Sequence, residues 1–178
     1  MNPLSPTACF VIQTIQAIMS LETLRMVYFA YIHSIISYGI IFGGNQPYSD
    51  KIFKIQKRVI RIITSSTPRD SCRELFKNLE ILPLYSQYIY SIYVVKNKHL
   101  FHTNNQTHCI HTRFKTNLHP PTANLTKFQK AVHYSAIKIF NNLPHEIKDL
   151  ANDILPFRNA LKRFLLTYSF YNSKEYFN

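Results

Sequence analysis

The sequence has little of what most binding and catalytic chemistry requires. It contains no Trp, three Gly and three Cys among 178 residues. Three glycines are too few for a loop that cradles a phosphate with backbone N–H groups. The cysteines, Cys9, Cys72 and Cys109, are odd in number and far apart, which gives no basis for a disulfide framework. We therefore expect reduced thiols and an intracellular protein, cytoplasmic or nuclear.

Acidic side chains are scarce as well, with nine Asp and Glu against 21 Lys and Arg. The four aspartates never adjoin, and the chain has no Gly-x-Ser-x-Gly motif. Paired carboxylates for acid–base chemistry and an activated nucleophile are therefore not expected. The sequence predicts no catalytic residue.

Histidines gather between residues 99 and 119. Zinc sites usually offer ligand pairs at short fixed spacing, and the chain has no Cys pair to begin one. We interpret this region as a long polar loop, near residues 102–125, that is rich in His, and we expect neither a metal nor another cofactor. The residues concerned are His99, His102, His108, Cys109, His111 and His119.

Hydrophobic residues make up 46% of the chain, and Gly and Pro interrupt it rarely. Long uninterrupted stretches with apolar residues three and four apart favour helices over a barrel or sandwich. We expect a mainly α fold, a small helical bundle. Residues 1–101 would form a helical region, and 102–178 the polar loop plus a C-terminal helical region packed in the same domain.

The most apolar stretch of the chain begins with a helix start at Ser20, whose side chain can cap the first turn. We expect the buried side of this helix to follow the three- and four-residue spacing, and Gly39 to end the helix. Residues 26–49 carry no charge, so a membrane span near 26–44 is an alternative. Polar residues and clustered glycines inside the stretch favour a buried helix instead. The expected buried positions are Leu21, Leu24, Tyr28, Tyr31, Ile35 and Tyr38.

The next stretch, KIFKIQKRVIRII at residues 51–63, carries five cations and no acid. On a helical wheel its isoleucines, Val59 and Gln56 fall on one side, and all five cations fall on the other. Solvated helix faces usually mix charges of both signs, because pairs four residues apart are favourable. A one-sided run fits the phosphate groups of nucleic acid or, in the alternative reading, the inner flank of a membrane helix.

Further helices are expected over residues 70–76, 85–100, 128–143 and 157–165. A second excess of charge lies in residues 101–140, with five cations and no acid. Within it, Lys127 and Lys130 lie off an apolar line and are candidate nucleic-acid contacts. The last twelve residues, TYSFYNSKEYFN, are expected to fray.

Five short motifs occur in a fixed order: 20–28 (SLETLRMVY), 37–44 (SYGIIFGG), 55–62 (IQKRVIRI), 82–84 (LPL) and 140–144 (FNNLP). Together they resemble the thumb and post-polymerase region of the reverse transcriptase of jockey-like non-LTR (LINE) retrotransposons. The resemblance covers nearly the whole chain, from about residue 4 onward.

In that family the thumb is a helical subdomain that packs against the template–primer duplex of RNA or DNA. The resemblance therefore implies that residues 1–101 are thumb-like and bind nucleic-acid backbone without catalysis. Matched position by position, the motif places Gln56, Lys57, Arg58 and Arg61 near that backbone. Lys51 and Lys54 lie outside the motif and are assigned by the helical wheel alone.

The polymerase of that family needs a palm with a Tyr- or Phe-x-Asp-Asp motif that holds magnesium. This chain has no Asp-Asp, so the resemblance implies a polymerase fragment without polymerase activity, and magnesium would belong to the missing palm. Gly43 stands where the family usually has Trp, which fits a second alternative, a remnant open reading frame with no cellular role. We expect no small-molecule substrate.

Overall fold

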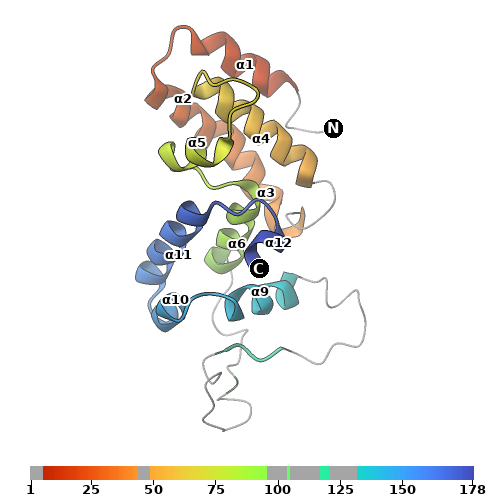
Figure 1. Ribbon diagram of the computed structural model, residues 1–178, viewed down its shortest axis with the longest axis vertical. Coiled ribbons are helices and arrows are strands. Elements are labelled where there is room, and N and C mark those ends of the chain that lie inside the picture. The colour runs from red at the N-terminus through yellow and green to blue at the C-terminus, as the bar shows by residue number, and fades with distance from the viewer. Residues whose placement is uncertain (1–5, 44–48, 96–103, 105–116, 121–131) are drawn as a thin grey trace. The chain divides into compact units, whose positions relative to one another are not determined.

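The computed structural model describes residues 6–43, 49–95, 104, 117–120 and 132–178, and every element in these ranges is a helix (Figure 1). The expected mainly α fold is confirmed. The elements of the N-terminal half are α1 (Pro6–Gln16), α2 (Leu21–Val27), the π-helix η1 (Tyr28–His33), α3 (Ser34–Gly43), α4 (Ser49–Ile63), α5 (Cys72–Asn78) and α6 (Leu84–Val95). Those of the C-terminal half are α9 (Val132–Asn141), α10 (His145–Asp149), the 3₁₀ turn η3 (Leu150–Asn152), α11 (Ile154–Tyr168) and α12 (Ser173–Phe177).

The chain divides into two compact units. Unit 1 contains Met1–Tyr88, Phe164–Tyr176 and Asn178, and unit 2 contains Ile89–Arg163 and Phe177. The boundaries thus fall inside α6 and α11. The division at residues 101 and 102, inferred from the polar loop, stays a prediction, because most of the expected loop at 102–125 lies outside the described residues.

The uncharged stretch forms three consecutive helical segments, α2, η1 and α3, without a break. Ser20 caps α2 as expected: its hydroxyl accepts a hydrogen bond from the Thr23 N–H at 3.3 Å. The prediction that Gly39 ends the helix is wrong, because Gly39 has no positive φ and α3 continues to Gly43. A glycine ends a helix by adopting the left-handed conformation, and this one does not.

The buried side of this helix also differs from the expected one. Its members are four residues apart: Leu24, Tyr28, Ile32, Ile36 and Ile40. In a pure α-helix such a stripe would rotate by about 40° at each step, since a turn takes 3.6 residues. The wider turns of the π-helix in the middle reduce this drift. Of the predicted positions, Leu24 and Tyr28 are buried, whereas Leu21, Tyr31 and Tyr38 are exposed.

The helix α4 is central to unit 1, where it packs on α1, α2 and α5. Figure 1 shows α1, α2 and α4 lying side by side. The apolar side predicted by the helical wheel is the side that faces these neighbours. Its buried members are Phe53, Gln56, Val59, Ile60 and Ile63.

The expectation that the C-terminal tail frays is wrong. Residues 169–176 do not fray: they return to unit 1 and end in α12, where Tyr176 is buried. Asn172 caps α12 by accepting a hydrogen bond from the Glu175 N–H at 3.0 Å. Aromatic side chains provide the reason, since each can bury a large apolar area.

In the described part of the chain, none of the helices has the length and apolar character that crossing a membrane would require.

Candidate nucleic-acid interface

Three of the five cations of α4 are exposed on the side opposite its buried stripe: Lys51, Lys54 and Arg58. They lie three and four residues apart, which places them along one line of the helix surface. The one carboxylate of α4 is Asp50 in its first turn, where an acid complements the helix dipole. The sequence-based two-sided helix is therefore confirmed, with a cationic line facing solvent.

Lys57 lies at the edge of this surface and is half-buried. Its ammonium is 4.6 Å from the ring centroid of Phe53 and 5.7 Å from that of Tyr171. Both distances fit cation–π attraction. The charge of Lys57 is thus held in place by two aromatic rings, one of them from the C-terminal tail.

Arg61 is also half-buried, and its guanidinium is oriented by the backbone. Nε and Nη2 donate to the carbonyl oxygen of Asp70 at 3.2 Å and 3.0 Å. A carbonyl is neutral, so Arg61 keeps its full positive charge while the loop before α5 fixes its position. A guanidinium has five N–H donors, and these two bonds leave the others for further acceptors.

Gln56 does not share this surface. It is 1% exposed, and its side-chain amide donates to the Tyr28 hydroxyl at 2.8 Å and to the Leu82 carbonyl at 3.0 Å. The helical wheel placed Gln56 on the apolar side correctly. The expectation that it lies near a nucleic-acid backbone is wrong for this fold, because its donors bond inside unit 1.

Two buried thiols lie close to the cations of α4. Burial raises the pKa of Cys72, while the charges of Arg61 and Lys57 oppose this rise. Burial likewise raises the pKa of Cys9 on α1, against the charge of Arg58. Both cysteines are therefore held as neutral thiols beside a positive surface, and neither is activated as a nucleophile.

Arg73 of α5 and Tyr171 of the C-terminal tail add a cation and a ring that the sequence patterns did not indicate. The guanidinium carbon of Arg73 lies 4.5 Å from the ring centroid of Tyr171, and Arg73 also forms an ion pair of 2.9 Å with Glu175. Lys57 and Arg73 thus both contact the Tyr171 ring. Periodicity within one helix cannot reveal such a cluster, because its members come from three separate elements.

The remaining candidates lie elsewhere. Lys127 and Lys130 fall outside the described residues, as do all members of the His-rich group except His119. Nδ1 of His119 is 3.3 Å from the side-chain oxygen of Asn104. Within the described ranges, no group of His, Cys, Asp or Glu could hold a metal ion.

Comparison with protein-family models, with curated proteins and with solved structures gave no match. The resemblance to a reverse-transcriptase thumb therefore remains a prediction that depends on the five motifs.

Proposed function

We propose that this chain is a non-catalytic fragment of a non-LTR retrotransposon reverse transcriptase that binds the nucleic-acid backbone through α4. The observation that supports this function best is the one-sided exposure of the helix. Its apolar side is covered by α1, α2 and α5, and Lys51, Lys54 and Arg58 face solvent. Such an array meets phosphates without reading bases, so binding is independent of sequence.

Lys57 and Arg61 extend the same surface with fixed geometry. Their hydrogen-bonding and aromatic contacts restrict the two side chains before any ligand arrives, which lowers the entropy lost on binding. A template–primer duplex, of RNA or DNA, presents phosphates at regular spacing and is the partner that the motifs imply. Contacts by three to five cations predict a slope of log K against log salt of about −3 to −4.5.

The test is a salt titration of duplex binding by fluorescence anisotropy. The triple variant Lys51→Glu/Lys54→Glu/Arg58→Glu should lose at least tenfold in affinity and most of its salt dependence. A matched control, Lys138→Glu/Lys162→Glu/Arg163→Glu, makes the same change in net charge at exposed positions of unit 2. The control should retain most of the affinity, since long-range charge alone contributes little at physiological salt.

Equal losses of duplex affinity in the two triple variants would show that binding depends on net charge and not on the exposed side of α4. A flat salt response of the unaltered chain would exclude backbone binding altogether.

A further inference from the structure

An aromatic cluster occupies the C-terminal end of α11 and the residues after it. The rings of Tyr168 and Phe170 are nearly parallel, at 9° with centroids 5.7 Å apart. Phe164 lies against both, at 4.9 Å and 5.8 Å. Tyr168 stacks on Phe170 and is still 56% exposed, so more than half of its surface is open to solvent. We call these three residues the aromatic platform.

Contacts with other residues of unit 1 fix the position of the platform. Phe170 packs edge-on against buried Tyr176, with centroids 5.1 Å apart. Ser169 adopts a φ of 49°, which ends α11 and turns the chain toward Phe170. The hydroxyl of Ser86 donates to the Phe170 carbonyl at 3.2 Å. A ring positioned in advance loses little entropy when a flat ligand stacks on it.

Two cationic side chains, Lys57 and Arg73, lie between α4 and this platform. Arg73 donates to the carbonyls of Tyr168 and Ser169 at 3.2 Å and 3.3 Å, while its guanidinium also lies over Tyr171. The other cation over Tyr171 is Lys57 of α4. The platform is therefore continuous with the proposed phosphate-binding surface.

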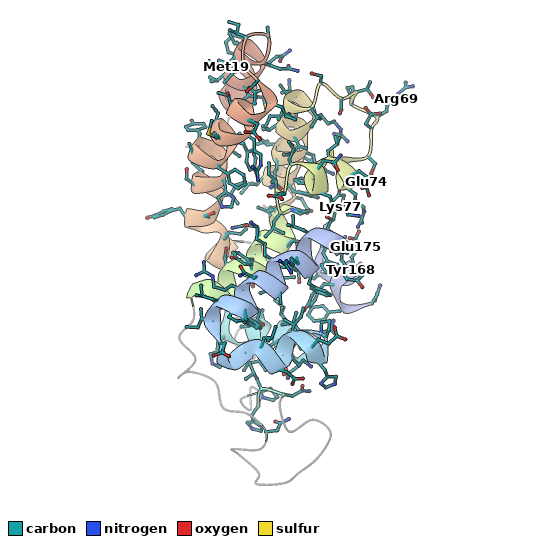
Figure 2. All side chains as sticks on the ribbon, turned by 90° about the vertical axis from the view of Figure 1, so that its left-hand side faces the viewer. Met19, Arg69, Glu74, Lys77, Tyr168 and Glu175 are labelled. Atoms are coloured by element: carbon teal, nitrogen blue, oxygen red, sulfur yellow. The ribbon has the colours of Figure 1, made fainter. Side chains whose placement is uncertain are left out.

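The acid in this region is Glu175, whose carboxylate accepts hydrogen bonds from Arg73 and from the Tyr171 N–H, both within 3.0 Å. Figure 2 shows Tyr168 and Glu175 close together, with Glu74 and Lys77 farther along the same side. Glu74 is likewise paired, with Lys77 at 3.2 Å. Lys174 is exposed and adds a further cation.

We propose that the aromatic platform stacks an unpaired base of single-stranded nucleic acid while its neighbouring phosphates lie along Arg73 and α4. This inference rests on the proposed backbone binding and adds a preference for single strands. A duplex hides the faces of its bases, whereas an unpaired base offers a flat π surface to Tyr168. Stacking of this kind tolerates any base, because every base has a π face.

The test compares two oligonucleotides of equal length, an ordinary single strand and one made entirely of abasic sites. Both carry the same phosphates, but the abasic strand has nothing to stack. Tyr168→Ala should weaken binding of the ordinary strand by about fivefold to a hundredfold, the range that stacking energies imply. The same change should leave binding of the abasic strand unaltered, and Tyr168→Phe should bind both strands as the unaltered chain does.

Tyr38→Ala is the matched control, because Tyr38 is 92% exposed and lies on α3. It should change neither affinity. Unaltered single-strand binding by Tyr168→Ala would overturn the stacking site and leave backbone binding intact. An equal loss for both strands would show that Tyr168 acts on phosphates or on the fold, not on bases. Absence of any binding by the unaltered chain would reject both proposals.

Discussion

The two units bury different kinds of polar group. Among the described residues of unit 1 the buried polar side chains are neutral, above all Gln56, Tyr28, Tyr85 and Tyr176. In unit 2 the ammonium of Lys148 is buried, with the residue 8% exposed. Its partners are two neutral oxygens, the side-chain oxygen of Asn117 at 3.1 Å and the backbone carbonyl of Asn141 at 2.6 Å.

This difference decides which positive charges can reach a polyanion. The net charge of +12 counts Lys148 and Lys54 equally. Lys54 is on the exposed side of α4, whereas Lys148 is enclosed among oxygens of its own unit. A cation that is already desolvated and bonded contributes little to phosphate binding. Charge counts therefore overstate a binding surface unless burial is known.

The largest expected effect is alkaline destabilisation through the buried tyrosines of unit 1. Burial raises the pKa of Tyr28, Tyr85 and Tyr176 far above the ordinary 10. Above pH 10 the unfolded chain releases these phenol protons and the folded chain keeps them, so ionisation favours unfolding. The loss is about 1 kcal/mol for each tyrosine between pH 10 and 11, or about 3 kcal/mol for the three, and it approaches about 1.4 kcal/mol per pH unit for each tyrosine at higher pH.

Urea unfolding at a series of pH values measures this loss. Tyr28→Phe should remove about a third of the fall in unfolding free energy above pH 10. Tyr38→Phe, at an exposed position, should leave that fall unchanged. A stability that stays constant up to pH 11 would contradict the burial of these hydroxyls.

A smaller loss of stability is expected when the buried amide of Gln56 is removed. Gln56→Leu leaves the Tyr28 hydroxyl without its donor and the Leu82 carbonyl without the amide hydrogen bond. An unsatisfied buried polar group costs about 1–3 kcal/mol, so we expect a loss of about 2 kcal/mol. Denaturant unfolding gives this value, and Gln13→Leu at an exposed position of α1 is the control.

The same variant sharpens the assignment of the interface. Because Gln56 bonds inside unit 1, the folded variant should bind duplex with an unchanged affinity. An affinity that falls by the same factor at every salt concentration would mean that Gln56 meets a phosphate after all, since a neutral amide releases no counterion.

The sequence predicted the part of the fold that depends on local periodicity. The alternation of cations and isoleucines in α4 specifies both of its sides, because neighbours three and four apart share a face. The same reasoning misplaced the stripe of α2, η1 and α3. A π-helix changes the number of residues per turn, and no apolar pattern of period 3.6 signals it.

The tail was missed for a different reason. Phe170, Tyr171 and Tyr176 follow no helical or strand spacing, so local patterns indicate nothing about them. Their order comes from partners distant in sequence, such as Arg73, which pairs with Glu175. Contacts of this kind depend on the tertiary fold and cannot be derived from composition or spacing within one segment.

The smallest expected effect concerns the buried cation of unit 2. Burial lowers the pKa of Lys148 from the ordinary 10.5. As pH rises toward 10.5 the unfolded chain therefore holds more protons than the folded chain, and Lys148 contributes increasing stability. Lys148→Met removes the hydrogen bonds to Asn117 and Asn141 and also the cost of a buried charge, so at pH 7 we expect a net loss of only about 1 kcal/mol.

The pH dependence of that difference is the decisive measurement. Ionisation of the tyrosines affects the unaltered chain and Lys148→Met alike, so it cancels when their unfolding free energies are subtracted. The difference should widen as pH rises from 8 to 10. Lys138→Met, at an exposed position of α9, should show no such trend. A difference that shrinks instead would mean that the fold stabilises Lys148 as a cation, and the contrast between a neutral core in unit 1 and a strained charge in unit 2 would be lost.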